Sequence, residues 1–179
     1  MRRFVSFAFA TTLALAAASA FGLSPDKDGW YHTGDGIRTK SVAFITVKVY
    51  AIGHDMKCLP KAKAKPEVIA ADCDKRFTWQ MQRDVDKEKI HNALREAYKM
   101  NGFTDEARIN KALGAFTVEL KEKSFVTITY NAQTKQTTFW EQGGGTTTVD
   151  GADFMTATWS IWFGKIDQPS LGDALISKL

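Results

Sequence analysis

A long alternating run between Arg38 and Ala51 does most to decide what this chain can fold into. Successive side chains of a β-strand point to opposite faces of a sheet, so strict alternation indicates a strand. One set of side chains is wholly apolar and consists of Ala43, Ile45, Val47 and Val49. The other set is mixed and consists of Val42, Phe44, Thr46, Lys48 and Tyr50. The pattern predicts a single long strand over 38–51 whose apolar face packs against a second layer.

Two glycines, Gly34 and Gly36, stand just before the arginine that begins this run. An arginine at a strand entrance is ordinarily a solvated charge. Glycine lets the backbone turn freely, and a turn here would bring the guanidinium of Arg38 over a cleft. The residues themselves leave three readings of Arg38 open: it faces a cleft, it is solvated, or it pairs with Asp35.

Further strand signals follow in two groups. Residues 76–85 alternate a polar face with an apolar face, which consists of Phe77, Trp79 and Met81. Residues 115–151 contain several β-branched and aromatic runs separated by turn residues near Lys121, near Gln133 and at three consecutive glycines. We therefore expect a second strand within 76–85 and a meander of antiparallel strands within 115–151.

Helical spacing separates and follows these strands. After Asp84 or Asp86, either of which can cap a helix, apolar residues recur at intervals of three and four until Asn101-Gly102 closes the segment. Shorter helices are expected from Thr104, over 154–164 and from Pro169. Strands, helices, strands and helices in this order predict an α+β fold, in which helices lie on one face of an antiparallel sheet.

The first residues have the pattern of a secretory signal peptide over 1–20. Two arginines precede an apolar run over 4–17, and Ala18-Ser19-Ala20 matches a small-x-small cleavage site. A transmembrane anchor is the alternative, but the run is shorter than the ~20 residues that span a bilayer. We expect the mature chain, 21–179, to form one domain with no membrane span and to be secreted or periplasmic.

The charge of the chain gives no reason to expect a nucleic acid partner. The formal net charge is +4, and loss of the two arginines in the signal lowers it by two. Basic residues are scattered, apart from Lys61, Lys63 and Lys65, which have the pattern of a solvated surface turn.

Both cysteines, Cys58 and Cys73, flank a polar stretch that contains two prolines. In an exported protein this arrangement predicts a disulfide that closes the loop between them, worth ~3 kcal/mol for a loop of this size. Metal binding and a redox role are disfavoured, because there is no CxxC pair and no histidine within the loop.

Motifs for catalysis or for cofactor binding are largely missing from the sequence. The three glycines at 143–145 lack the Lys-Ser/Thr of a phosphate-binding loop, and no GxSxG, HExxH or EF-hand pattern occurs. His32, His54 and His91 are expected at the surface or in turns, and haem ligation by one of them is an open alternative. We expect no cofactor and no metal.

Six aromatic residues are distributed over the predicted sheet and helices: Trp79, Phe125, Phe139, Trp140, Trp159 and Trp162. Each taken alone is most simply a core residue. Their distribution over both layers nevertheless suits a cleft between the sheet and the helices.

Three segments together resemble the chalcone isomerase-like family, in particular its bacterial exported branch. They are the strand entrance "GDGIRTKSVAFITVKVY", the strand and helix "RFTWQMQRDVDKEKIHNAL", and the late helix "VDGADFMTATWSIWFG". The resemblance covers most of the mature chain and agrees in the order of elements. It implies an open-faced β-sandwich, in which a large antiparallel sheet is covered by helices and a ligand cleft lies between them.

The enzymes of this family close a chalcone to a flavanone, and an arginine at the strand entrance stabilises the developing negative charge. The resemblance places Arg38 in that role. When Tyr50 is aligned with the family's strand-end tyrosine, the other catalytic positions do not carry over. The threonine falls at Ile45 beside Thr46, and the late-helix polar residue falls near Ile161 beside Ser160. The helix tyrosine falls near Asp86, and the helix asparagine falls near Ala93 beside Asn92.

The non-catalytic relatives of these enzymes bind fatty acids, pairing the carboxylate with the same arginine and a nearby tyrosine. The resemblance therefore implies that Arg38 grips an acidic head group, with Tyr50 or Tyr130 supplying a hydroxyl. Our leading hypothesis is an exported binding protein for an apolar or amphiphilic small ligand. Two alternatives stay open: an isomerase or intramolecular lyase of a conjugated, chalcone-like molecule, and a structural or interaction role.

Overall fold

The computed structural model of this chain describes residues 22–179, and the expected signal peptide over 1–20 lies outside the described residues. Six strands and five helices follow one another along the chain. They are β1 (Tyr31–Val42), β2 (Ile45–Met56), α1 (Lys65–Ala70), β3 (Lys75–Met81), α2 (Lys87–Met100), α3 (Glu106–Leu113), β4 (Phe125–Asn131), β5 (Gln136–Glu141), β6 (Thr146–Asp150), α4 (Ala152–Phe163) and α5 (Pro169–Ala174).

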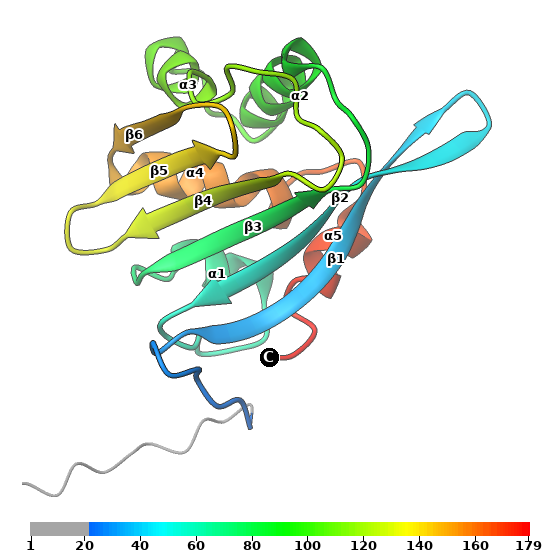
Figure 1. Cartoon of the computed structure of the whole chain (residues 1–179). Coiled ribbons are helices and arrows are strands. Elements are labelled where there is room, and N and C mark those ends of the chain that lie inside the picture. Colours follow the sequence, from blue (N-terminus) through cyan, green and yellow to red (C-terminus); the bar gives the residue numbers. More distant parts are fainter. Residues whose placement is uncertain (1–21) are drawn as a thin grey trace, which may run out of the picture.

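The six strands form one antiparallel sheet in the order β1-β2-β3-β4-β5-β6. The helices lie together on one side of this sheet and leave its other face open (Figure 1). The predicted α+β class, with a large antiparallel sheet covered by helices, is confirmed.

The core lies between the sheet and α4, whose residues are buried on nearly every side. The ring of Phe77 on β3 lies 5.0 Å from that of Trp159 and 4.5 Å from that of Trp162. Trp79 and Phe139 are buried in the same core, whereas Phe125 and Trp140 lie on the open face and are 39% exposed. Burial of each large aromatic side chain contributes ~1.5–3 kcal/mol to stability.

The expectation of one continuous strand over 38–51 is wrong, because the chain reverses at Ala43 and Phe44. Residues 31–42 form β1, and β2 returns antiparallel to it, with Val42 opposite Ile45. The reversal places Ala43 at φ 55°, a left-handed conformation that alanine rarely adopts. The turn was not predicted because the sequence has no glycine, asparagine or aspartate there. The alternation of side chains also continues through the turn without a break.

Gly34 and Gly36 allow close packing rather than a turn. A Cβ on Gly34 would lie 2.2 Å from the carbonyl oxygen of Ala174, and one on Gly36 would lie 2.5 Å from Cδ1 of Leu171. Neither glycine has a positive φ. The prediction that they bend the chain is therefore wrong, and their role is to let α5 and the following residues approach β1.

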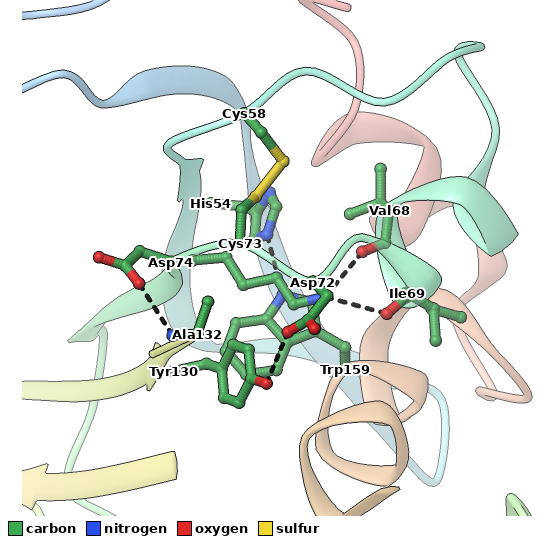
Figure 2. The surroundings of a disulfide bond; sticks show 11 residues. His54, Cys58, Val68, Ile69, Asp72, Cys73, Asp74, Tyr130, Ala132 and Trp159 are labelled. Carbon is green, nitrogen blue, oxygen red and sulfur yellow. Dashed lines mark hydrogen bonds between the residues drawn. A yellow bond between two sulfur atoms is a disulfide. The ribbon is translucent and has the colours of Figure 1, made fainter. Parts of the chain in front are cut away.

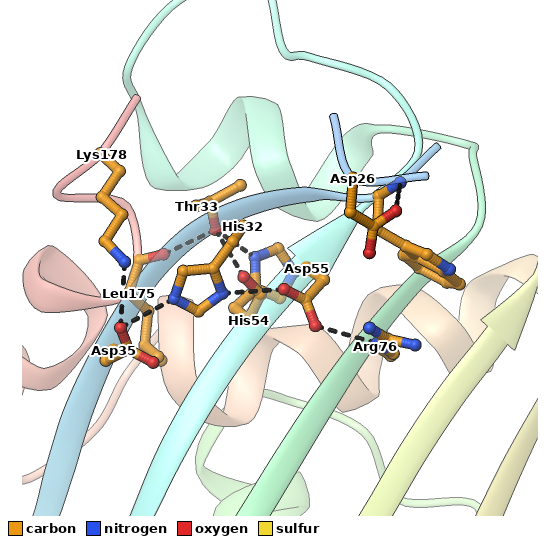
Figure 3. Close-up of polar contacts among 10 residues, drawn as sticks. Asp26, His32, Thr33, Asp35, His54, Asp55, Arg76, Leu175 and Lys178 are labelled. Carbon is orange, nitrogen blue, oxygen red and sulfur yellow. Dashed lines mark hydrogen bonds and ion pairs between the residues drawn. The ribbon is translucent and has the colours of Figure 1, made fainter. Parts of the chain in front are cut away.

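The C-terminal residues are held on β1 by polar contacts (Figure 3). The hydroxyl of Thr33 lies 2.8 Å from the carbonyl oxygen of Leu175, and the backbone N–H of Lys178 donates to the carbonyl of Thr33 over 2.9 Å. Asp35 lies 3.2 Å from the ammonium of Lys178 and 2.7 Å from Nε2 of His32. Asp35 thus pairs with Lys178 and His32, and not with Arg38.

His54 is buried, and its expected position at the surface or in a turn is wrong. The indole N–H of Trp159 donates to Nε2 of His54 over 2.9 Å, and Nδ1 lies 2.7 Å from the hydroxyl of Thr33. Burial, followed by the nearby charge of Lys75, holds the pKa of His54 well below its usual value. The neutral ring has both nitrogens engaged in the core, which leaves neither free for a haem iron.

The predicted disulfide between Cys58 and Cys73 is present. The loop it closes contains α1, a helix that the sequence analysis missed because Ala64 at its N-cap makes no side-chain cap and only Pro66 indicates its start. Lys65 is part of this helix, so the expected surface turn at Lys61, Lys63 and Lys65 holds for the first two only.

Lys75 begins β3, two residues after the stapled loop, and its side chain is fully buried. Its Nζ donates to the carbonyl oxygens of Val68 and Ile69, each over 2.9 Å, and it lies 5.0 Å from the centre of the Trp159 ring. These carbonyls end α1, where a positive charge is favoured by the helix dipole. The loop is therefore fixed from both sides, by the disulfide and by this ammonium.

Burial of Lys75 makes stability depend on pH above neutrality. Burial lowers the pKa of Lys75 from 10.5 to about 7, so between these values the unfolded chain binds more protons than the folded one. We expect the free energy of unfolding contributed by this group to rise with pH from 7 to 10, by about 1 kcal/mol per pH unit. Urea unfolding of Lys75→Met should lack this rise, while Lys111→Met, at an exposed lysine of α3, should retain it. Equal slopes in both variants would contradict the assignment.

Candidate functional site

A cavity of about 660 Å³ lies between the hairpin of β1 and β2 and the start of α2. This volume falls within the ~300–1,000 Å³ typical of small-molecule sites. Its walls are mainly apolar and consist of Ile45, Val47, Val49, Trp79, Val85, Ile90, Ala93 and Leu94. Its polar lining consists of Arg38, Lys40, Tyr50, Arg83, Asp84 and Lys89.

A β-bulge on β2 brings Tyr50 to the same wall as Val49. Arg38 is paired with Tyr50 but the next residue, Thr39, is paired with Lys48, so Val49 is an extra residue on β2. An extra residue shifts the alternation of a strand by one. Ile45, Val47 and Val49 therefore line the cavity on one side of the bulge, and Tyr50 lines it on the other. Strict alternation had placed Tyr50 on the face opposite Val49, which is wrong.

Arg38 is held at the side of the cavity by the segment between α4 and α5. Its side chain is 16% exposed, and one terminal nitrogen lies 2.6 Å from Oδ1 of Asp167. The other terminal nitrogen donates to Oε1 of Gln168 over 3.3 Å. A guanidinium has five N–H donors, so these two contacts leave donors for a further acceptor.

Tyr50 lies across the hairpin from Arg38 and is fixed by two tryptophans. Its ring stacks on that of Trp79 at 4.6 Å, and its hydroxyl oxygen accepts the indole N–H of Trp162 over 3.1 Å. Burial raises the pKa of Tyr50, so the hydroxyl keeps its proton. That proton has no acceptor among the residues that the structure describes, which leaves it available to an anion beside Arg38.

A second cavity of about 210 Å³ continues from the first toward α4. The two share five residues: Arg38, Lys40, Tyr50, Ala93 and Leu94. The second is also lined by Ile161 and Asp167. Arg38 and Tyr50 therefore lie where the two cavities meet, with the larger apolar space on one side of them.

The larger cavity has a positive lining. Arg38, Lys40, Arg83 and Lys89 face it with a single acidic residue, Asp84. The carboxylate of Asp84 is itself held by Lys121 at 3.1 Å. The balance of charge favours an anionic ligand.

The structure brings two of the predicted ligand-binding residues, Arg38 and Tyr50, into one site and leaves the other three outside its lining. Thr46 is exposed on the side of β2 away from the cavity, because it alternates with Ile45 and Val47. Asn92 is exposed on α2, next to the lining residue Ala93.

Tyr130 lies at the opposite end of the sheet. It is paired with Lys75 at one end of β3, whereas Tyr50 is paired with Met81 at the other end, ~20 Å away along the strand. Its hydroxyl donates to Asp72 over 2.8 Å, beside the disulfide (Figure 2).

The sequence analysis missed the basic residues that face the cavity with Arg38. Lys40, Arg83 and Lys89 come from a strand, a loop and a helix that only the tertiary fold brings together. One signal was present: the apolar stripe of α2, predicted to face the sheet, supplies Ile90 and Leu94 to the cavity wall.

Three of the four positions that the resemblance assigned to polar catalytic residues line this space, but as apolar side chains. Ile45 and Ala93 line the larger cavity, and Ile161 lines the smaller one. At these three places the site presents carbon where a catalytic site of the family would offer oxygen or nitrogen. Asp86, at the fourth, caps α2 and does not line either cavity.

Comparison with known proteins agrees with this architecture. The profile of chalcone isomerase-like proteins matches residues 31–175, from the start of β1 to the end of α5. The chain belongs to the chalcone isomerase-like family. The family resemblance inferred from the three sequence segments is confirmed.

A solved structure similar to this chalcone isomerase-like protein is that of a fatty-acid binding protein from Arabidopsis thaliana. The TM-score is 0.68 at 16% sequence identity, and the match covers 86% of this chain and 90% of the other. The likeness shows a shared fold. A search of curated proteins gave no match.

Within residues 22–179 no helix is long and apolar enough to cross a membrane. In the same residues no group of three or more histidine, cysteine, aspartate or glutamate side chains is arranged to hold a metal ion.

Proposed function

We propose that this protein is an exported, non-catalytic carrier that binds an apolar small molecule with an acidic head group, such as a fatty acid. The observation that supports it most is the position of Arg38 and Tyr50 at one end of a mainly apolar cavity. In this arrangement the acyl chain lies along Val47, Val49 and Leu94, and the carboxylate meets the guanidinium. The name of the Arabidopsis neighbour, a fatty-acid binding protein, supports the same class of ligand.

The head group is recognised by charge and by hydrogen bonds from two largely buried side chains, those of Arg38 and Tyr50. A guanidinium binds a carboxylate through two parallel N–H donors, and the free hydroxyl proton of Tyr50 supplies a third. Asp167 already pairs with Arg38, but its side chain is 47% exposed. A ligand carboxylate can therefore share Arg38 with Asp167, or replace it while the Asp167 carboxylate turns to water.

The apolar replacements argue for binding rather than for catalysis. An isomerase of conjugated molecules needs polar groups placed on the reacting atoms, in addition to the cation. Here Ile45, Ala93 and Ile161 occupy three of those positions. Flavanone formation from a chalcone by the wild-type protein, lost in Arg38→Ala, would favour the alternative of an intramolecular lyase.

Export is supported by the signal pattern over 1–20 and by the disulfide, since such bonds persist in oxidising compartments outside the cytoplasm. Fractionation of cells that express the full chain tests this directly. The oxidised, shortened protein is expected in the periplasm or the medium.

The class of ligand is tested by comparing two molecules that differ only at the head. We expect palmitate to bind at least ~10-fold more tightly than hexadecanol at neutral pH, because only the carboxylate forms charge-assisted hydrogen bonds. Calorimetric titration of the delipidated protein measures both. Equal affinity for the two molecules would contradict the role of Arg38 as an anchor. Failure of the protein to bind either molecule would contradict the proposed function.

A further inference from the structure

The hairpin of β1 and β2 projects beyond the other strands of the sheet (Figure 1). Phe44 at its tip is fully exposed, at 105% of the reference area, and Ile45 beside it is 67% exposed. Exposed apolar groups that are large and lie together on a protrusion indicate a surface that meets another apolar phase. We call Phe44 and Ile45 the hairpin tip.

Basic side chains surround the hairpin tip. Between Ile37 and Val49 the hairpin carries three basic residues and no acidic one, namely Arg38, Lys40 and Lys48. Arg38 and Lys40 are paired with Asp167. Lys48 is exposed, as are Arg83 and Lys89 at the cavity, and none of these three forms an ion pair within the described part of the chain.

The tip and the cavity share a residue. Ile45 is exposed at the tip and also lines the larger cavity, whose wall continues inward through Val47 and Val49 to Tyr50. A continuous apolar path therefore leads from the fully exposed Phe44 to the head-group site at Arg38.

We propose that the hairpin tip docks into the surface of a bilayer containing anionic lipid, and that the acyl ligand passes between bilayer and cavity along β2. The proposal rests on the proposed function for its cargo. Phe44 and Ile45 enter the region between head groups and acyl chains, while Lys48, Arg83 and Lys89 lie against the anionic head groups. Each basic residue near such a surface contributes ~1 kcal/mol, and the aromatic anchor adds its burial.

The complementarity of charge favours a membrane over a second copy of the chain. A protein partner seated on Phe44 would have to present a matching acidic rim, and in a symmetric pair of tips the basic residues would face each other. Reversible contact of this kind needs no helix that crosses the bilayer.

The test is flotation of the mature protein with vesicles of phosphatidylcholine and phosphatidylglycerol, compared with vesicles of phosphatidylcholine alone. We expect binding to the anionic vesicles that falls at high salt. Phe44→Ser should reduce the bound fraction at least ~5-fold. The matched control is Phe125→Ser, at a phenylalanine 39% exposed on the open face of the sheet, which should leave it unchanged.

Two results would overturn the proposal. One is equal flotation of the Phe44→Ser and Phe125→Ser variants. The other is a concentration-dependent dimer in analytical ultracentrifugation that Phe44→Ser abolishes, because the tip would then be an interface between copies.

The cargo step is separable from the docking step. Phe44→Ser should keep wild-type palmitate affinity in a vesicle-free titration, since Phe44 does not line the cavity. Its uptake of palmitate from anionic vesicles should be at least ~5-fold slower than that of Phe125→Ser. Normal flotation without palmitate binding would refute the proposed cargo and leave the docking site standing.

Discussion

Replacing Arg38 with alanine is expected to weaken palmitate binding about 10- to 100-fold while leaving the fold intact. Hydrogen bonds to a charged group are worth ~1.5–3 kcal/mol, and the variant removes the paired N–H donors that lie beside the hydroxyl of Tyr50. Arg38→Lys should recover part of the loss, because an ammonium keeps the charge but not the paired donors. Calorimetric titration measures the affinity, and urea unfolding checks stability.

The matched control is Arg95→Ala on α2. Arg95 is also partly buried and paired, with its guanidinium 2.8 Å from the side-chain oxygen of Asn110 and 3.4 Å from Glu106, but it does not line either cavity. Palmitate should bind this variant as it binds the wild type. Equal losses in both variants would mean that the effect is not local to the cavity.

Removing the disulfide is expected to lower the free energy of unfolding by ~3 kcal/mol. The bond closes a loop with a sequence separation of 15, and constraint of the unfolded chain by a loop of this size accounts for the value. Urea unfolding of the double variant Cys58→Ala and Cys73→Ala measures it. The loss should not extend to the affinity for palmitate, because the stapled loop and the cavity lie at opposite ends of β3.

The wild-type protein kept reduced with a thiol is the matching control for the double variant. Its stability should fall by a similar amount, since the same cross-link is lost without a change of side chain. A decrease below ~1 kcal/mol in both would show that Lys75 and the core hold α1 without the staple.

Most of the helices and strands were predictable, because each depends on a pattern of residues that are close together in the sequence. The alternation of 76–85, the spacing of α2 between Asp86 and Asn101, and the helix ended by Gly164 each follow from contacts within a few residues of one another. The cysteine pair was predictable because few alternatives exist for two cysteines in an exported chain.

The wrong predictions have physical causes that leave no signal in the local sequence pattern. The turn at Ala43 and Phe44 uses a left-handed alanine, and the bulge at Val49 reverses the faces of the strand without a glycine to mark it. The burial of His54 depends on partners from β1 and α4, which are distant in the sequence.

The candidate site was only partly predictable. Arg38 and Tyr50 were identified through the family resemblance, and the structure places them in one cavity. The rest of the lining forms where the hairpin packs beside residues 83–94. No pattern in either segment predicts that the two lie together. The hairpin tip was missed because residues 38–51 were expected to form one continuous strand, with no turn at Phe44.

The central claim is that Arg38 anchors an acidic amphiphile in the cavity, and native mass spectrometry of the purified mature protein tests it most directly. The wild type and the Arg38→Ala variant would be prepared alike and measured before and after incubation with palmitate, and organic extracts would identify any bound molecule. We predict a retained carboxylic acid, or uptake of one palmitate, in the wild type and a large loss of both in the variant. Bare protein in both samples, with no uptake of palmitate, would contradict the claim.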